Sequence, residues 1–411
     1  MPLRGVAEVA LGRQRAPQHA EGPHMVPYLR AANVKDGELA LDDVLAMNFT
    51  PREQKIFSLV PGDVLVTEGS GSLSSVGAAA VWNGEIDGTI CFQNTLLRLR
   101  PRPGVTDGRF LGWWARSAFG SGLFASVATG ANIYHVSAER VRALPIDLPS
   151  LEEQRSIADF LDVEAARLNR AESVMRGQFA LLAERRKAII NSVLVSGMDV
   201  PRVRLGYRVE LVTSGPRGWG DYASESGELF FRSGNLHRDS ISPNKTNLVY
   251  VEVPGAALAE ASRSRVRVGD VLVGITGANT GWVACADEQI ESAYVSQHVC
   301  LVRPASRRVD GCWLAYVLSS SEVQNELMAG QYGGTKTQLS LPDIRNVMLP
   351  IIPLEKQRIT ARQIGKELEA IDRQRAARAR QLELLAERKQ TLITVAVTGE
   401  IDVATARGIQ E

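Results

Sequence analysis

Two acidic side chains lie close together in the stretch PGDVLVTEGSG, residues 61–71, and such a pair could bind a metal ion or exchange protons. Asp63 and Glu68 are residue types that hold the metal of a nuclease. A similar stretch, VGDVLVGITG at residues 268–277, keeps Asp270 but has no acid that matches Glu68, and neither stretch continues into Glu-x-Lys. We therefore interpret both Gly-Asp pairs as turns that lead into buried strands.

Other residue types that perform chemistry do not occur at useful spacings. The four cysteines form no CxxC pair and are predicted to be buried thiols in a reducing cytoplasm: Cys91, Cys285, Cys300 and Cys312. The five histidines show no metal-binding spacing. The chain also lacks an Asn-Pro-Pro-aromatic methylase motif, a GxxxxGK[ST] loop and a GxSxG motif. The sequence therefore predicts no catalytic residue, no metal site and no cofactor in this chain.

Composition and charge set outer limits on the function. A chain of 411 residues is long enough for two or three domains. Residues 1–150 contain 14 Lys and Arg against 14 Asp and Glu, and residues 201–350 contain 15 against 15. A nucleic-acid-binding protein of this composition must gather its basic residues on one face, or a partner must supply the charge. No apolar run is long enough to span a membrane and the N-terminus has no signal-peptide core, so we expect a cytoplasmic protein.

A long internal repeat is the strongest signal in the sequence. When the chain is shifted by about 203 positions, five stretches coincide in the same order. They are YLRAANV (28–34) with FFRSGNL (230–236), PGDVLVTEGSG with VGDVLVGITG, LRLRP (97–101) with CLVRP (300–304), GANIYHVSAERVRALP (130–145) with GGTKTQLSLPDIRNVMLP (333–350), and LLAERRKAIINSVLVSGMDV (181–200) with LLAERKQTLITVAVTGEIDV (384–403). Each copy is predicted to be one domain followed by one long helix.

The domains contain short β-like runs between turn residues and fewer helical stretches, which predicts an α+β class. The tandem module comprises a first mixed domain at 1–148, a helix at 149–200, a second domain at 201–352, a helix at 353–403 and a tail at 404–411. In the helices, apolar residues recur with a heptad spacing typical of a coiled coil. The predicted seam is Leu161, Leu168, Met175, Leu182 and Ile189 in the first helix, and Ile364, Ile371, Leu385 and Leu392 in the second.

Because each helix has a single apolar stripe and follows a domain, we expect the two helices to pair antiparallel. That pairing would bring Glu172 close to Arg375 or Arg378 inside the seam. We predict an ion contact there that sets the register, although these side chains could instead extend to solvent. Both helices open with a similar phrase, PSLEEQR at 149–155 and PLEKQR at 353–358. The repeated phrase indicates the same junction from domain to helix.

In nearly its whole length the chain resembles the specificity subunit of type I restriction–modification systems. The resemblance is carried by the two helix openings, the LLAERR and LLAERK stretches, the SGMDV and TGEIDV ends, and the segment before the second helix. It implies two target-recognition domains that read double-stranded DNA, antiparallel spacer helices and no catalysis. It also implies a partner adenine methyltransferase that uses S-adenosylmethionine, and restriction subunits that use ATP and Mg. Two departures are Ala131-Asn132 in place of Gly334-Thr335, and a shortened N-terminus.

Base-reading residues are expected on loops that differ between the copies. In the first domain the candidates are Arg13, Arg15, His19, Ser70, Ser72, Ser74, Ser75, Asn132, Tyr134 and His135. In the second they are Arg217, Trp219, Asn279, Thr280, Tyr332, Thr335, Lys336 and Gln338. Arg30 and Arg232 match between copies, so they fit a framework or phosphate contact. For methyltransferase binding the candidates are Gln154, Arg155, Gln357 and Arg358, and helix capping explains these four equally well.

Two other classes of function stay open from the sequence. The first is a scaffold that holds two protein-binding domains on a coiled coil, which the neutral charge of the domains favours. The second is a hydrolase within the α+β domains, for which no nucleophile–base pair is visible.

Overall fold

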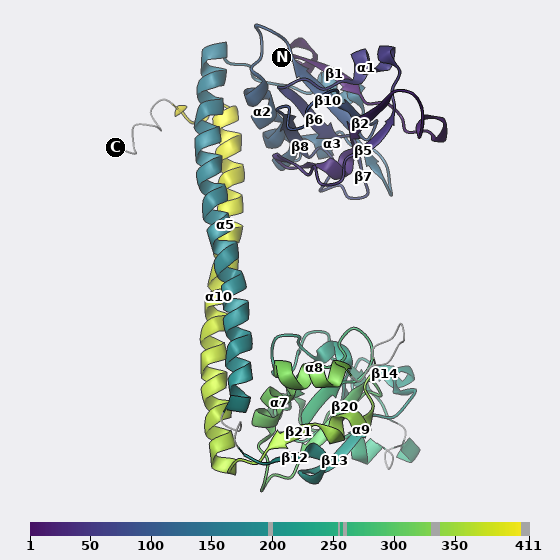
Figure 1. Ribbon diagram of the computed structural model, residues 1–411, viewed down its shortest axis with the longest axis vertical. Helices are drawn as coiled ribbons and strands as arrows, with labels where there is room; N and C mark the ends of the chain where they lie inside the picture. The colour runs from purple at the N-terminus through teal and green to yellow at the C-terminus, as the bar shows by residue number, and fades with distance from the viewer. Residues whose placement is uncertain (196–199, 254, 258–260, 330–337, 404–411) are drawn as a thin grey trace. The chain divides into compact units, whose positions relative to one another are not determined.

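The computed structural model describes residues 1–195, 200–253, 255–257, 261–329 and 338–403. Its contacts divide the chain into two units, Met1–Met175 with Arg380–Glu411, and Arg176–Ala379. Each unit therefore contains one α+β domain and half of each long helix, α5 (Leu151–Val195) and α10 (Leu354–Val397) (Figure 1). The tandem α+β architecture predicted from the repeat is confirmed. The two units differ from the predicted modules in one respect, because each unit contains a part of both helices and not one whole helix.

The first domain is built on a four-stranded antiparallel sheet with the order β1-β10-β6-β8. Its strands are β1 (Ala7–Leu11), β10 (Leu96–Pro101), β6 (Asp63–Thr67) and β8 (Ala79–Trp82). Helix α2 (Gly108–Gly120) packs on β6 and β8. A smaller sheet follows the order β5 (Leu45–Asn48), β2 (Met25–Leu29), β9 (Cys91–Phe92). The remaining elements are β3 (Val34–Lys35), β4 (Glu38–Leu39), α1 (Pro51–Phe57), β7 (Gly69–Ser70), α3 (Leu123–Ser126), β11 (Tyr134–His135) and α4 (Ala138–Ala143).

The second domain repeats this arrangement. Its main sheet has the order β13-β20-β17-β18, made of β13 (Val209–Ser214), β20 (Val299–Pro304), β17 (Val271–Gly274) and β18 (Val283–Cys285). Helix α7 (Gly311–Ser319) packs on β17 and β18 as α2 does in the first domain. The second sheet has the order β14 (Ala223–Ser224), β16 (Val249–Val251), β15 (Glu228–Phe231), β19 (Tyr294–Val295). The other elements are β12 (Arg202–Arg204), α8 (Ser321–Ala329), α9 (Leu341–Asn346) and β21 (Met348–Pro350).

In the first domain the Gly-Asp turn is joined to the neighbouring strand β10 by an ion pair. Gly62 has a left-handed φ of 93°, which glycine adopts without strain, and Asp63 at the start of β6 is fully buried. Arg100 of β10 donates from Nε and Nη2 to the two carboxylate oxygens of Asp63, each at 2.7 Å. The Val60 amide donates to the same carboxylate at 2.8 Å. With its charge paired and its oxygens occupied, Asp63 serves the fold rather than a nuclease site.

The second copy contains the same pair. Arg303 of β20 donates from Nε and Nη2 to Asp270 at 3.0 and 2.7 Å, and the Arg267 amide donates to Asp270 at 2.8 Å. The arginine before the final proline of LRLRP and CLVRP, Arg100 in one copy and Arg303 in the other, is therefore the partner of the turn aspartate. The interpretation of both motifs as turns into buried strands is confirmed.

The two helices pair antiparallel within each unit. In the second unit, Arg378 donates from Nε to the side-chain oxygen of Gln178 at 3.1 Å, and Arg186 forms an ion pair with Asp372. The partner number falls as the α5 number rises, so the helices run in opposite directions. In the first unit, Lys389 donates to the side-chain oxygen of Asn169 at 2.6 Å. Burial lowers the pKa of this lysine, and the charge of nearby Arg116 acts in the same direction.

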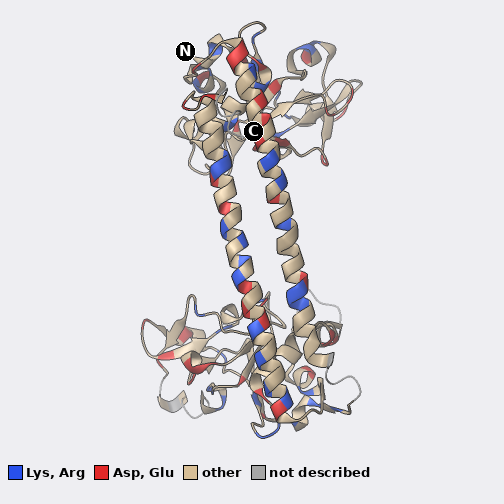
Figure 2. Ribbon diagram, turned by 90° about the vertical axis from the view of Figure 1, so that its left-hand side faces the viewer, with Lys and Arg blue, Asp and Glu red and all other residues tan. Residues whose placement is uncertain are grey.

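The residues of the predicted seam are shielded from solvent. Five of its residues are buried, namely Leu161, Leu168, Leu182, Ile364 and Ile371, and the other four are half-buried. Lys, Arg, Asp and Glu are interspersed along both helices (Figure 2). Arg375 lies over the Phe179 ring at 4.9 Å. The ion contact predicted for Glu172 stays a prediction.

One cysteine prediction is wrong. Cys285 at the end of β18 and Cys312 in α7 form a disulfide with a Cα–Cα distance of 5.4 Å, because helix packing brings them together across 27 residues of sequence. Cys91 and Cys300 are buried free thiols, and burial raises the pKa of each to about 12. Within the described ranges, no helix is long and apolar enough to cross a membrane. In the same part of the chain, no three His, Cys, Asp or Glu side chains are grouped as metal ligands.

Candidate nucleic-acid interface

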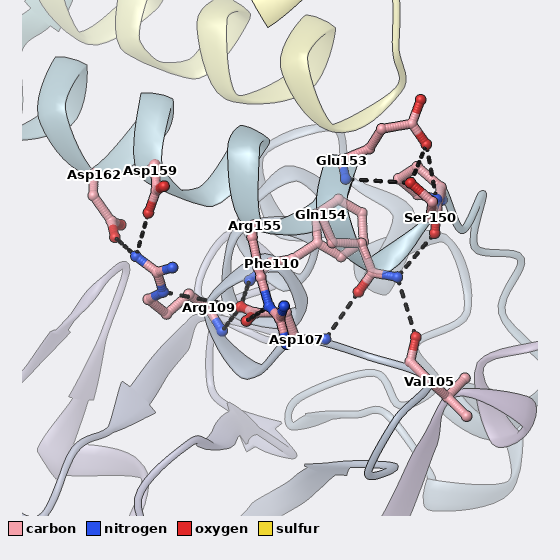
Figure 3. A network of polar contacts seen from close by, with 11 residues as sticks. Val105, Asp107, Arg109, Phe110, Ser150, Glu153, Gln154, Arg155, Asp159 and Asp162 are labelled. Carbon is pink, nitrogen blue, oxygen red and sulfur yellow. Dashed lines mark hydrogen bonds and ion pairs between the residues drawn. The ribbon is translucent and has the colours of Figure 1, made fainter.

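A buried glutamine fixes the start of α5 to the first domain. Gln154 is fully buried, and its side-chain oxygen accepts from the Asp107 amide at 2.8 Å (Figure 3). Its nitrogen donates to the carbonyls of Val105 at 3.1 Å and Pro149 at 2.9 Å. Asp107 is in turn the N-cap of α2 and accepts from the Arg109 amide at 2.9 Å. One amide side chain therefore links the turn after β10, the cap of α2 and the start of α5.

The second module has the same clamp. Gln357 accepts from the Asp310 amide at 2.9 Å and donates to the carbonyls of Arg308 at 3.0 Å and Ile352 at 2.9 Å. Asp310 is the N-cap of α7. The prediction that the two glutamines bind a methyltransferase is wrong, because Gln154 and Gln357 are buried and fully occupied inside their own units. This clamp is the physical reason for the repeated opening phrase.

The arginines that follow the glutamines stay accessible. Arg155 has a side chain that is 65% exposed and lies 4.0 Å from the Asp107 carboxylate. Arg358 is 45% exposed and lies 4.0 Å from Asp310. Both contacts are long and solvated, so they add little stability. A role in partner binding stays a prediction for these two residues.

The arginines that match between the copies belong to a repeated turn. The Arg30 amide donates to the side-chain oxygen of Asn33 at 3.0 Å, and the Asn33 side chain donates to the Ala40 carbonyl at 2.8 Å. In the second domain the Arg232 amide donates to Asn235 at 3.0 Å. Both asparagines are buried. The backbones of Arg30 and Arg232 thus serve the framework, while their side chains reach the surface.

Three candidate base readers are inaccessible, and their prediction is wrong. Arg13 is 7% exposed, forms an ion pair with Glu53 at 2.8 Å and lies over the Phe49 ring. Burial acts to raise the pKa of Glu53, but hydrogen bonds with Thr50 and the charge of Arg13 bring it below its usual value. Trp219 is 3% exposed among the aromatic rings of the second sheet. Thr280 is buried and donates to the Gly277 carbonyl at 2.7 Å.

The structure brings together two groups of candidates in the first domain. Strand β11 pairs antiparallel with β7, with Tyr134 opposite Ser70 and His135 opposite Gly69. The serine loop and the loop around Asn132 therefore meet at one edge of the domain. Ser72, Ser74, Ser75, Asn132 and His135 are exposed there, whereas Ser70 and Tyr134 are half-buried. These residues, with exposed Leu73 and Ile133 among them, form a mainly polar edge that a DNA groove could contact.

The second domain forms the corresponding edge. Thr276 pairs with exposed Gln338 in an isolated antiparallel bridge. Half-buried Asn279 lies near this edge but donates to the Ser233 carbonyl at 2.8 Å, so its amide serves a turn. Tyr332, Thr335 and Lys336 lie outside the described residues. Arg15 and Arg217 are exposed, and half-buried His19 lines a small pocket with Arg15.

Sequence reasoning missed four polar residues at these edges, namely Glu68, Thr276, Gln297 and His298. In the first domain the Glu68 carboxylate lies 3.1 Å from Nδ1 of His135. In the second domain His298 contacts Thr276 and Gln297, at 2.6 and 3.1 Å. A signal was present for Gln297 and His298, because QNT at 93–95 and SQH at 296–298 each lie one residue before the matched LRLRP and CLVRP stretches and differ between the copies.

Comparison with known proteins assigns this arrangement to a family. Residues 1–172 match the model of the type I restriction modification DNA specificity domain. A Methanocaldococcus jannaschii protein, named as the MjaX specificity subunit of a type I restriction enzyme, is 22% identical over 404 residues, which cover 92% of this chain and 88% of that protein. A solved chain from work on complex assembly of the type I R-M system superimposes with a TM-score of 0.74, at 18% identity, over 98% of this chain and 97% of that one.

Residues 1–172 thus match the type I restriction modification DNA specificity domain, and nearly the whole chain is similar to type I specificity subunits. The HsdS subunit of Thermoanaerobacter tengcongensis has the same fold, with a TM-score of 0.54 and 21% identity over 98% of this chain and 96% of that one. The EcoKI specificity subunit of Escherichia coli is 26% identical over 174 residues, 41% of this chain and 36% of that protein. The duplicated clamps, turns and edges therefore occur in a chain with the fold of these subunits.

Proposed function

We propose that this specificity subunit reads an interrupted, asymmetric DNA site, with each domain recognising one half of it. The observation that carries the proposal is a repeated framework with unlike edges. The clamps of Gln154 and Gln357 and the aspartate–arginine pairs recur in both domains. The polar residues at the two edges differ. One scaffold with two surfaces suits two unrelated short base sequences.

The long helices would set the distance between the half-sites and bind the partner subunits. Their charged faces, and Arg155 and Arg358 at their starts, are available for such contacts. The partner would be an adenine methyltransferase that binds S-adenosylmethionine and flips the target adenine out of the duplex. Restriction subunits with ATP and Mg would supply translocation and cleavage. This chain would contribute no catalytic residue, and the complex would act in the cytoplasm.

Mapping of methylated adenines tests the proposal. The chain is co-expressed with its partner methyltransferase, and methylated positions are located across a genome by single-molecule sequencing. We expect two short fixed blocks separated by an unread gap of constant length. Exchange of residues 1–148 for the corresponding domain of another specificity subunit should alter one block only. Methylation without a shared interrupted sequence would contradict the proposal.

The scaffold alternative predicts a different result in a binding experiment. The comparisons do not favour it, but the balanced charge of the domains motivated it. Contacts to DNA phosphates release counterions, so six to ten such contacts would weaken DNA binding by about 10³- to 10⁵-fold between 50 and 200 mM salt. Retention of a duplex with the mapped site, with this steep loss, supports DNA reading. No retention at low salt supports the scaffold.

A further inference from the structure

Three positions on the edge of each domain have equivalent backbone contacts but unlike side chains. In the first domain, the Glu68 amide donates to the Thr95 carbonyl at 2.9 Å, and the Val136 amide donates to the Glu68 carbonyl at 2.8 Å. The residue after β6 is thereby held between the turn at residues 93–95 and the segment that precedes α4. His135 directly precedes Val136 in the sequence, and Asn94 directly precedes Thr95.

The second domain repeats the same hydrogen bonds. The Ile275 amide donates to the His298 carbonyl at 3.0 Å, and the Leu339 amide donates to the Ile275 carbonyl at 2.9 Å. His298 therefore occupies the place of Thr95. By the same correspondence Gln297 matches Asn94, and Gln338 matches His135.

All three positions are polar in both domains, and none keeps its residue type. This contrasts with the framework positions, where an aspartate, an arginine, an asparagine and a glutamine recur unchanged. Gln338, His298 and His135 are exposed, and Gln297, Asn94 and Thr95 are half-buried. Accessible positions that stay polar but change residue type, beside framework positions that keep theirs, are expected where two domains bind different base sequences.

Each set includes a histidine that a neighbour orients. The Glu68 carboxylate contacts Nδ1 of His135 at 3.1 Å, and Thr276 Oγ1 contacts Nδ1 of His298 at 2.6 Å. Gln297 also contacts Nε2 of His298 at 3.1 Å. A side chain held by a neighbour loses less conformational freedom on binding than a free one.

We propose that Asn94, Thr95 and His135 in the first domain, and Gln297, His298 and Gln338 in the second, are the specificity-determining residues that contact base edges in the major groove. The inference rests on the proposed function and names the residues that would contact the bases. The exposed Gln338 amide of the second set offers the paired donor and acceptor that match the N6 and N7 edge of adenine. Glu68 and Thr276 are positioning residues, because they act through the histidines.

An exchange of the sets tests the inference. The second set is converted to the first by Gln297→Asn, His298→Thr and Gln338→His, in the full chain co-expressed with the methyltransferase. Because a bidentate base contact discriminates by about 1–3 kcal/mol, each lost contact should reduce methylation at the original second block by about 5- to 150-fold. The altered complex should select a different second block and leave the first block unchanged.

The first block is an internal control for folding and assembly, and Glu322→Gln is a matched control in the same domain. Glu322 forms an exposed ion pair with Arg202, and its change should leave both blocks unaltered. If the triple variant unfolds at a lower temperature, Gln297→Asn alone, which removes one methylene, carries the same test. A folded variant that selects the original second block at an unchanged rate overturns the inference. If the unaltered complex methylates no interrupted site, the proposed function itself fails.

Discussion

Removal of the Gln154 clamp should destabilise the first unit and leave the second unit intact. The substitution Gln154→Met keeps the length of the side chain but removes one acceptor and two donated hydrogen bonds. The Asp107 amide and the carbonyls of Val105 and Pro149 would lose their partner inside a site that is fully buried. Because each hydrogen bond contributes about 0.5–1.5 kcal/mol net, the three together stabilise the unit by about 1.5–4.5 kcal/mol.

This loss corresponds to a melting shift of about 3–18 °C for a unit of this size, at roughly 2–4 °C per kcal/mol. Differential scanning calorimetry of the full chain measures it, and Gln357→Met should lower the transition of the other unit instead. Gln363→Met is the matched control, because Gln363 is exposed on α10 and donates only to Glu367. If Gln154→Met shifts the melting temperature no more than this control does, the clamp does not stabilise the junction and the reasoning is refuted.

Three further outcomes follow from buried groups elsewhere in the chain. Asp63→Asn should lower the free energy of unfolding by about 3–5 kcal/mol, because it leaves the charge of Arg100 uncompensated. Urea titration measures this change, and a loss of less than about 1 kcal/mol would contradict the pairing. Reduction of the disulfide, or the double substitution of Cys285 and Cys312 by Ala, should destabilise the second unit alone by about 2–4 kcal/mol, measured by calorimetry with and without reductant. An equal shift of both units would speak against it. Cys300 should resist alkylation at pH 8 in the folded chain, because burial raises its pKa to about 12 and keeps the thiol protonated, and mass spectrometry should find it modified only after unfolding.

Local sequence predicted the elements whose pattern is complete within a short stretch. The heptad spacing identified the seam residues of both helices, and all nine are buried or half-buried. The Gly-Asp turns were predicted because a Gly-Asp pair followed by an apolar run is typical of a turn that leads into a buried strand. The duplicated order of motifs predicted two copies of one module, and the structure adds that their main sheets have equivalent strand orders.

The accessibility of single polar residues could not be predicted in this way. Arg13 is a surface-type residue in a loop-like stretch, yet Glu53 and Phe49 enclose it. Gln154 lies in a charged first turn that is typical of a solvated helix start, yet the Asp107 amide, 47 residues away, turns its amide inward. Cys285 and Cys312 are joined only because α7 packs on β18.

The sequence by itself determined the duplication, the class of each module, the pairing stripe of the helices and the family. These depend on the order and periodicity of residues, which a single chain displays directly. Only the tertiary structure decided which polar side chains are hydrogen-bonded inside the fold and which stay accessible at the edges of the domains. The reason is that a buried polar group must find a partner, and such partners come from segments distant in sequence, whose positions the packing of sheets and helices sets.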